Sequence, residues 1–410
     1  MNDRPVHAPV NHFPVIDNCL TAGGTKLTEL AVRVGQTPFY VYDRTVMTER
    51  MNSLRESLPP EIYLHYAIKA NPMPAVVQHM AGLVDGLDVA SLGEMQVALD
   101  TGTRPPDISF AGPGKTDKEL ASAIAAGITI NLESEGEMER AAHMGAAQGR
   151  RPQVAVRVNP DFELKTSGMK MGGGPKQFGI DAERVPAVLK RLGELNMAFR
   201  GLHIFSGSQN LRPESIIEAQ NKTLDLAFRL AEHAPSTLQW LNIGGGFGIP
   251  YFPGERPLDI EPISANLRSR LPEVKTRLPD AELVIELGRY LVGEAGLYVC
   301  EVVDRKISRG QVFLVTNGGL HHHLAASGNF GQVIRKNYPV CIANRVESGE
   351  IEVTNVVGPL CTPLDVLADK MPLPRADRGD LVAVFQSGAY GYTASPHGFL
   401  SHPEIREVLV

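Results

Sequence analysis

The sequence predicts an α/β protein with a (β/α)8 barrel and a second, C-terminal all-β domain. Between about residues 60 and 290, eight short apolar runs alternate with segments rich in Ala, Leu, Glu and Lys that have helical spacing. After Arg289, short strand-like runs are separated by turn residues alone. Eight β-then-α units in about 230 residues favour a closed barrel over an open sheet. We therefore predict a barrel domain over residues 46–290 and a β-sheet domain from residues 1–45 and 291–410.

Each predicted element is a run bounded by turn residues. The expected barrel strands are 62–69, 87–90, 108–111, 128–132, 154–159, 201–204, 241–243 and 283–286. The expected helices between them include 73–83, 93–99, 117–126, 186–195 and 213–234. The expected strands of the second domain are 297–303, 312–316, 340–343, 351–357 and 380–385, and a further strand at 37–43 precedes the barrel.

Composition excludes several classes of protein. With 40 basic and 46 acidic residues the net charge is −6, which gives no electrostatic footprint for nucleic acid or an anionic membrane. No apolar run approaches the roughly 18 residues of a membrane span, and residues 1–14 have no apolar core of signal-peptide length. The four cysteines, Cys19, Cys300, Cys341 and Cys361, are scattered without zinc or disulfide spacing. We expect a soluble, cytoplasmic protein with reduced thiols.

Lys69 is the most informative single residue. The apolar run that begins at Ile62 brings an amine to its end, and Asn71-Pro72 then stops the strand. An ammonium is costly to bury unless it is neutralised, paired or reacted, although most lysines at strand ends simply reach solvent. A lysine in this position can form a Schiff base with a carbonyl cofactor.

Polar and glycine residues follow most of the other predicted strands, and in a barrel the strand ends meet on one rim. Each has an ordinary alternative: a glycine run can be a tight turn, a histidine can belong to the core, and Glu286 with Arg289 can be a surface ion pair. Together these residues indicate one pocket. They are Asp88, Arg157, His203, Ser206, Gly245, Gly246, Glu286 and Arg289.

This set of groups matches the needs of pyridoxal 5′-phosphate. The cofactor requires an amine for its aldehyde, anion-binding groups for its phosphate and a partner for its ring nitrogen. Bare glycine amides after a late barrel strand suit the phosphate, and the Arg289 guanidinium matches its oxygens. A carboxylate such as Glu286 keeps the ring nitrogen protonated, which favours loss of a carboxylate over racemisation.

The chain resembles the fold-type III pyridoxal-phosphate decarboxylases, the group of diaminopimelate, ornithine and arginine decarboxylases, which share an alanine racemase-like two-domain architecture. The resemblance extends from about Pro38 to Val410. The motifs that carry it are residues 66–71, 88–94, 157–160, 203–209, 244–248, 286–289, 358–361 and 388–391.

The resemblance implies roles for individual residues. Lys69 is expected to carry the cofactor as a Schiff base, His203 to stack on its ring, Glu286 to hold its nitrogen, and Cys361 to return a proton after carbon dioxide leaves the external aldimine. The loop that carries Cys361 enters the partner's active site in this family, which implies a homodimer with shared sites. The other positions expected to bind the cofactor are Asp88, Arg157, Ser206, Gly245, Gly246, Arg289 and Tyr390.

Departures from the family concern the substrate. Thr362 stands where an acidic residue usually follows the cysteine, with Asp365 three residues later, and Asn317 replaces the usual Asp of an Asp-Gly-Gly stretch. Residues 321–330 and 361–365 look more like decarboxylases of secondary-metabolite or polysaccharide clusters, some of which act on an amino acid tethered to a carrier protein. The expected substrate is therefore an amino acid, free or carrier-bound, contacted by Thr362, Asp365 and Asn317.

Three other interpretations remain open. A racemase of the same fold would need an Arg at the ring nitrogen in place of Glu286. A cofactor carrier would be a barrel alone, without a β domain carrying Cys361. A non-catalytic regulator should have lost groups such as Lys69. The run His321-His322-His323 suggests metal binding, but consecutive residues of a strand point to alternate faces, so we expect no metal site.

Overall fold

The computed structural model describes residues 5–163, 169–170, 172–332, 335–347 and 349–410. The chain folds into two compact units. The β unit comprises Met1–Glu49, Pro250–Pro257 and Leu291–Val410, and the barrel unit comprises Arg50–Ile249 and Leu258–Tyr290. Among the described residues, no helix combines the length and apolar character that a bilayer crossing requires.

Eight parallel strands form a closed barrel, which confirms the predicted fold class. Each of the eight predicted runs overlaps a barrel strand, and the ring closes where Leu283 pairs with Ile62 and where Asn131 pairs with Ala155. Most of their residues are buried, as expected for parallel strands covered on both faces. In ring order the strands are β5 (Ile62–Ala67), β6 (Gly86–Val89), β7 (Ile108–Phe110), β8 (Thr129–Leu132), β9 (Gln153–Asn159), β12 (Ala198–Ile204), β14 (Trp240–Gly245) and β15 (Glu282–Leu287).

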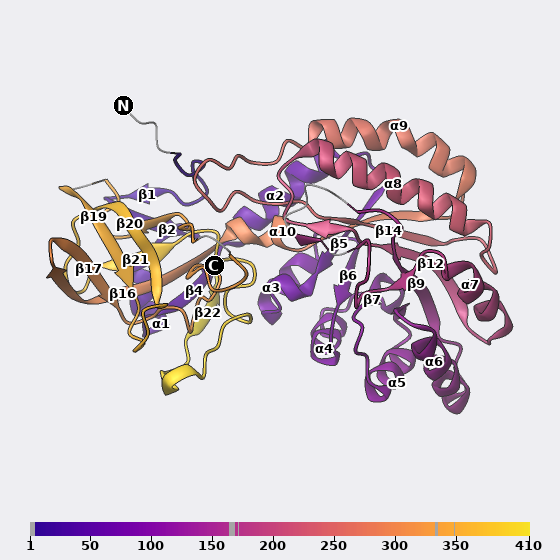
Figure 1. Cartoon of the computed structure of the whole chain (residues 1–410). Helices are drawn as coiled ribbons and strands as arrows, with labels where there is room; N and C mark the ends of the chain where they lie inside the picture. The colour runs from indigo at the N-terminus through magenta and orange to yellow at the C-terminus, as the bar shows by residue number, and fades with distance from the viewer. Residues whose placement is uncertain (1–4, 164–168, 171, 333–334, 348) are drawn as a thin grey trace. The chain divides into compact units, whose positions relative to one another are not determined.

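Helices cover the outside of these strands, with α4, α5 and α6 on one side and α8 and α9 on another (Figure 1). Ser91, Thr116 and Ser134 accept hydrogen bonds from the first-turn amides of α4, α5 and α6, which places each helix start directly after its βα loop. The helices are α2 (Arg44–Ser57), α3 (Pro74–Ala81), α4 (Leu92–Asp100), α5 (Asp117–Ala126), α6 (Glu135–Gln148), α7 (Val185–Glu194), α8 (Pro213–Ala231), α9 (Glu261–Arg277) and α10 (Arg289–Val292).

Short elements fill the remaining connections of the barrel unit. Strand β11 extends the sheet at β9, and β10 pairs with β13. Their bounds are β10 (Met169–Lys170), β11 (Ile180–Asp181), β13 (Gly207–Ser208), η1 (Ile68–Ala70) and η2 (Pro105–Asp107).

The β unit is built on a sheet in which β16 is the central strand. Strand β4 pairs with one end of β16, where Tyr40 lies opposite Tyr298, and β22 pairs with β4. The strands are β18 (Val340–Ile342), β21 (Leu381–Val384), β16 (Gly296–Ser308), β17 (Gln311–Thr316), β19 (Ile351–Val357) and β20 (Val366–Pro374) in sheet order, with β4 (Phe39–Tyr42) and β22 (Arg406–Leu409) beside them.

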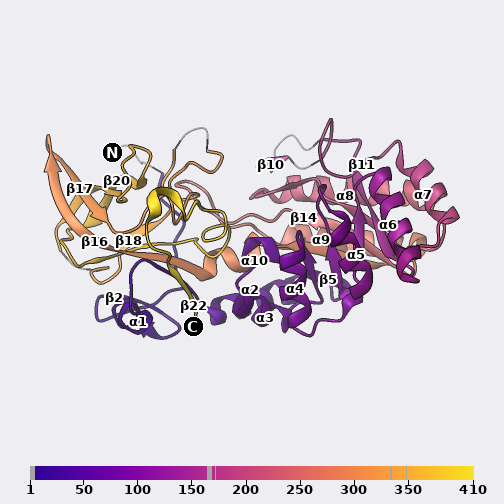
Figure 2. The ribbon, with the colours of Figure 1, turned by 90° about the horizontal axis from the view of Figure 1, so that it is seen from below.

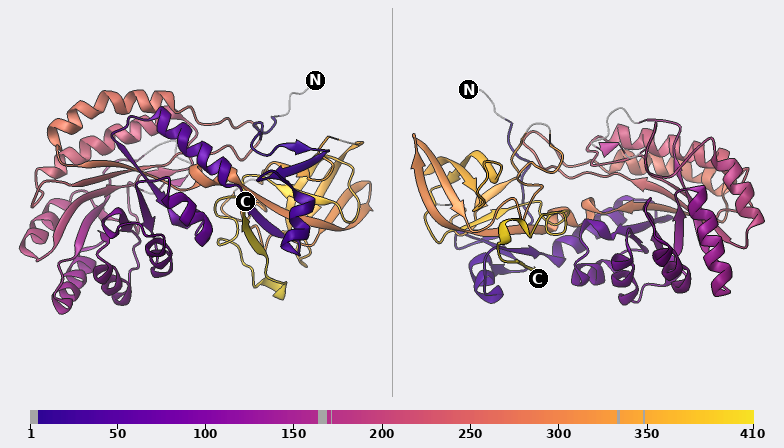
Figure 3. Two further views of the ribbon diagram at one scale, coloured as in Figure 1. Left: turned by 180° about the vertical axis from the view of Figure 1, so that it is seen from behind. Right: turned by 60° about the horizontal axis from the view of Figure 1, so that its bottom comes forward.

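The N-terminal segment packs on this sheet. Helix α1 (Leu27–Val34) lies next to β2 (Figures 2 and 3), and its Leu27 and Leu30 belong to the same buried cluster as Val41 and Leu297. Residues 250–257 also belong to this unit, because the Tyr251 ring packs 4.6 Å from that of Tyr338. The smaller elements are β1 (Val15–Ile16), β2 (Cys19–Ala22), β3 (Thr25–Lys26), η3 (Gly293–Ala295) and η4 (Phe399–Ser401).

The three consecutive histidines do not lie in a strand, so the expectation of alternate faces was wrong. The backbone N–H groups of His322 and His323 both donate to the carbonyl of Gly319, which coils the run into tight turns. All three rings are buried, and the rings of His321 and His322 are 3.7 Å apart. Burial lowers the pKa of His321 to about 4 and those of His322 and His323 to about 3.

His323 is held as a neutral imidazole by its hydrogen bonds. Its Nδ1 accepts from the Ala326 amide at 3.2 Å, so Nε2, 2.9 Å from Ser387 Oγ, is the nitrogen that carries the proton. Protonation of Nδ1 would break the bond to Ala326 and place a charge in the core.

We expect the stability of the β unit to fall as the pH drops from about 6.5 towards 3, because the unfolded chain binds a proton at His323 before the folded protein does. His323→Asn keeps a hydrogen-bond acceptor but does not titrate. The free energy of unfolding of this variant should therefore change less with pH than that of the wild type, by up to about 1.4 kcal/mol per pH unit. Urea unfolding between pH 4 and 7 measures it. The exposed His233→Asn is the control, and an unchanged slope in His323→Asn would contradict the assignment.

Candidate cofactor and catalytic site

Lys69 lies at the C-terminal rim of the barrel, although not at the end of a strand as predicted. Strand β5 stops at Ala67, and Lys69 is the middle residue of the 3₁₀ turn η1. Asn71 has the extended conformation that a following proline favours, and its carbonyl accepts a hydrogen bond from the hydroxyl of Tyr66. The turn leaves the Lys69 side chain 44% exposed, with Nζ 3.7 Å from Oε1 of Glu286.

Glu286 is a buried carboxylate near the end of β15, with a side chain only 7% exposed. Its Oε2 accepts a hydrogen bond from Asn242 Nδ2 at 3.3 Å and lies 3.2 Å from Nε2 of His203. Burial alone would raise the pKa of Glu286, but His203, Lys69 and Arg157 outweigh burial and hold that pKa below its usual range. Glu286 is therefore ionised at neutral pH.

His203, at the end of β12, presents a buried flat ring to the rim. The rings of His203 and Trp240 meet in an edge-to-face arrangement, with centroids 6.2 Å apart and planes at 66°. Neither ring nitrogen has a hydrogen bond of good geometry within the described parts of the chain, so the 3.2 Å approach to Glu286 is an electrostatic contact. A ring of this kind fits the predicted stacking role.

The glycine run forms a cradle that side chains cannot enter. Gly244 and Gly246 have φ of +69° and +75°, and a Cβ on Gly245 would lie 2.4 Å from the Glu286 carbonyl oxygen. A Cβ on Gly246 would lie 2.5 Å from the carbonyl oxygen of Gly207. Only bare backbone fits here, which is the arrangement that anionic oxygens need for close approach to amides.

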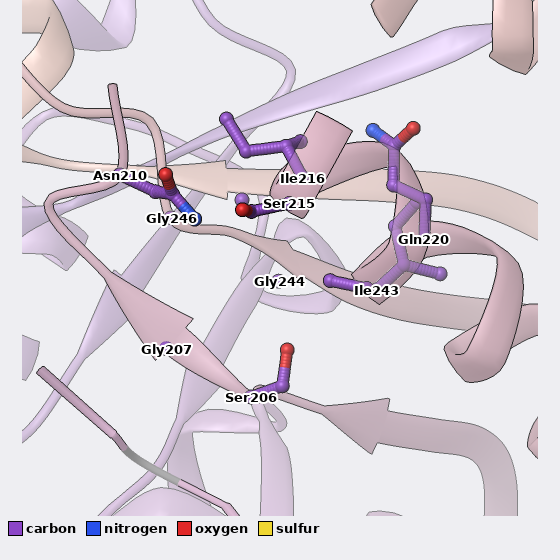
Figure 4. Close-up of a pocket in the computed structure, with 11 residues that line it drawn as sticks. Ser206, Gly207, Asn210, Ser215, Ile216, Gln220, Ile243, Gly244 and Gly246 are labelled. Carbon is purple, nitrogen blue, oxygen red and sulfur yellow. The ribbon is translucent and has the colours of Figure 1, made fainter. Parts of the chain in front are cut away.

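A cavity adjoins the glycine run, and Ser206 lines it together with Gly245 and Gly246 (Figure 4). Arg289 is the first residue of α10, one glycine after the end of β15. These groups fit a phosphate, so the residues present agree with the cofactor that the sequence predicts. The sequence did not single out Asn210, Ser215 and Gln220, which also line the cavity because α8 begins beside the glycine run.

Asn242 is a further residue of this site that sequence reasoning missed. It is fully buried, donates to Glu286 through Nδ2, and accepts from the Gly244 amide at 2.7 Å through Oδ1. One side chain therefore ties the glycine cradle to the buried carboxylate. A polar residue inside the apolar run 241–243 was the available signal.

Asp88 and Arg157 belong to a second polar network inside the same barrel. Asp88 contacts His65 Nδ1 at 3.2 Å and accepts from Ser109 at 2.5 Å. Arg157 donates to Glu133 at 2.8 Å. Burial lowers the pKa of His65, but the Asp88 carboxylate outweighs it and raises that pKa overall. The predicted Asp88 and Arg157 are thus held by residues that the sequence did not identify.

The remaining predicted residues lie in the β unit. Cys361 is exposed, and the Thr362 amide donates to the carbonyl of Leu360. Tyr390 has a left-handed backbone, with φ of 54°. Asp365 accepts from the amides of Leu320 and Leu360 at 2.6 and 2.8 Å, and burial raises its pKa.

Asn317 is likewise used within the β unit. It donates to Thr37 and accepts from the Glu301 amide. The structure thus brings Lys69, His203, Ser206, Gly245, Gly246, Glu286 and Arg289 to one rim of the barrel, while Asn317, Cys361, Thr362, Asp365 and Tyr390 belong to the other unit.

The sequence is similar to those of known pyridoxal-dependent decarboxylases, in agreement with the cofactor that the site residues fit. The family model described as "Pyridoxal-dependent decarboxylase, pyridoxal binding domain" matches residues 44–293. The L-glutamyl-[BtrI acyl-carrier protein] decarboxylase of Niallia circulans is 39% identical over 390 residues, covering 94% of this chain and 91% of that protein. The diaminopimelate decarboxylase of Aquifex aeolicus is 32% identical over 397 residues, covering 96% of this chain and 91% of that protein.

A solved structure of similar fold is the diaminopimelate decarboxylase from M. jannaschii in complex with L-lysine. It has a TM-score of 0.89 and 26% sequence identity, and the match covers 98% of this chain and 93% of that chain.

Gly246→Ala should weaken cofactor binding, because its Cβ would enter the cradle 2.5 Å from the Gly207 carbonyl oxygen. We expect at least about a tenfold rise in the dissociation constant for pyridoxal 5′-phosphate, measured by absorbance titration of the apoprotein. Gly102→Ala is a matched control, since Gly102 also has positive φ but nothing lies within 4 Å of an added Cβ. Equal affinities of the two variants for the cofactor would show that the glycine run does not bind its phosphate.

Proposed function

This chain belongs to the family of pyridoxal-dependent decarboxylases and uses pyridoxal 5′-phosphate, and from that premise we propose that it decarboxylates an amino acid carried by an acyl-carrier protein. The observation that carries the proposal is its similarity along nearly the whole chain to the Niallia circulans enzyme, whose name specifies a carrier-bound L-glutamyl substrate. The proposed substrate is therefore a carrier-bound glutamyl or closely related group.

Sequence at the substrate positions supports this choice. A free diamino acid has a distal amine that calls for an acidic partner, and Thr362 stands where the family usually places that acid. Asp365 is the acid of the same loop, but two backbone amides already occupy its carboxylate. A thioester-linked substrate has no distal charge to pair, so an uncharged side chain such as Thr362 suits it better.

In the proposed reaction, each of the barrel residues has a separate role. When bound, pyridoxal 5′-phosphate withdraws electrons from the substrate Cα into its ring. Lys69 would hold the aldehyde carbon, and Glu286 would keep the ring nitrogen protonated. His203 would contact the ring. Ser206, Gly245, Gly246 and Arg289 would bind the phosphate, a role that the family resemblance also assigns to Tyr390.

Cys361 is the proposed proton donor to Cα after carbon dioxide leaves. Its exposed position suits a group that must meet a substrate outside its own unit. By analogy with the family, we infer that Cys361 serves Lys69 of a partner subunit, so that the enzyme is a homodimer. Light scattering of the active holoenzyme that gave only a monomer would contradict this.

Asp365 acts in this proposal as a positioning residue. Asp365 joins the turn at Leu320 to the loop at Leu360, next to Cys361. Gly319 and Gly358 leave room for it, because a Cβ on either would lie within 2.3 Å of an Asp365 oxygen. The carboxylate thus holds the segment that carries the proton donor.

Carbon dioxide release from a panel of substrates tests the function. We expect kcat/KM for L-glutamyl-carrier protein to exceed that for free diaminopimelate, ornithine, lysine or glutamate by about 100-fold or more, because the carrier supplies binding energy that free amino acids lack. Lys69→Ala is the negative control. Efficient turnover of free diaminopimelate or ornithine, with none of the carrier-bound group, would overturn the proposal.

A further inference from the structure

A second cavity lies at the opposite end of the barrel strands from Lys69. Its volume is about 300 Å³, and its walls include Thr129 and Gln153, the first residues of β8 and β9. Three arginines, Arg150, Arg151 and Arg200, line it. Nothing in the catalytic site uses these residues.

Arg200 lies at a β-bulge in β12. Phe199 pairs with Val154 and Gly201 pairs with the next residue, Ala155, so Arg200 is the extra residue between them. Gly201 is required, since a Cβ there would lie 1.7 Å from the Trp240 carbonyl oxygen. The Arg200 carbonyl accepts from the Gln239 amide, which fixes the backbone at the bulge.

Charge at this cavity is uncompensated. Among the residues that the structure describes, no carboxylate pairs with Arg150, Arg151 or Arg200. Arg151 donates to the carbonyl of Met197, and the Nε of Arg200 is buried without a hydrogen-bond partner. Asp107, which follows the lining residue Pro106, is bound by Arg104 at 2.8 and 3.1 Å.

The contrast with other arginines of the barrel unit is informative. Arg157, Arg191 and Arg270 each contact a carboxylate in this acidic chain. Three guanidinium groups of one charge line the same cavity without a carboxylate among its lining residues, and the buried Nε of Arg200 is a donor without an acceptor there. Planar guanidinium groups are the side chains best suited to bind oxyanions through paired hydrogen bonds.

We propose that this cavity binds a small oxyanion with at least two negative charges, either a phosphate or a polycarboxylate. The site is separate from the cofactor cradle, which is formed by Gly244–Gly246 at the other end of the strands. It does not depend on the identity of the decarboxylated substrate.

Titration of the holoenzyme tests the site, because bound cofactor occupies the phosphate cradle. Inorganic phosphate and citrate are titrated separately into the holoenzyme, and calorimetry measures the heat of binding. Sodium chloride holds the ionic strength constant. We expect either or both to bind, and Arg200→Gln and Arg150→Gln to weaken binding about tenfold or more. The better ligand identifies the oxyanion class. Arg378→Gln, an exposed arginine of the β unit, should bind as the wild type does.

Two results would overturn the proposal: no binding of either anion, or binding that both variants retain at wild-type affinity. Arg150 is exposed, so Arg150→Gln should keep the cofactor and wild-type decarboxylation. If Arg200→Gln disturbs the bulge and fails to fold, the Arg150→Gln result decides.

Discussion

The ionised carboxylate of Glu286, buried inside the barrel, is the constraint on which the site depends. Removing a carboxylate from water costs several kcal/mol unless charged and hydrogen-bonding partners replace the solvent. Lys69, His203 and Asn242 supply those partners from three other strands or their ends. Closure of the barrel makes this possible, because it places β15 between β14 and β5.

The register of the barrel strands explains why the partners of Glu286 lie at the same level of the barrel as its carboxylate. His203 lies opposite Asn242 on neighbouring strands, and Gly245 lies opposite Glu286. Between Asn242 and Gly245 the register shifts, and the left-handed Gly244 takes up the change. Asn242 spans this irregularity and bonds to both sides of it. The glycine cradle proposed for the phosphate and the carboxylate proposed to hold the ring nitrogen are thus parts of one local structure.

Much of the fold was predictable because parallel strands are buried on both faces and so appear as continuous apolar runs. The residues after those runs also predicted the rim, from Lys69 to Arg289. Local turns were harder: the 3₁₀ turn at Lys69 and the coiled run at His322 depend on backbone hydrogen bonds that residue type does not encode. Asn242 and His65 were missed since an inward polar residue in an apolar run resembles core until its partners are known.

We propose that the reaction depends on the negative charge of Glu286, and the Glu286→Gln variant tests that dependence. Gln keeps the shape and the contact with Asn242 but loses the charge. We expect the variant to bind cofactor with its normal absorbance yet to decarboxylate at least about 100-fold more slowly. Glu282→Gln, at the exposed start of the same strand, should be unaffected. A Glu286→Gln enzyme with wild-type kcat would show that the reaction does not need the charge of Glu286.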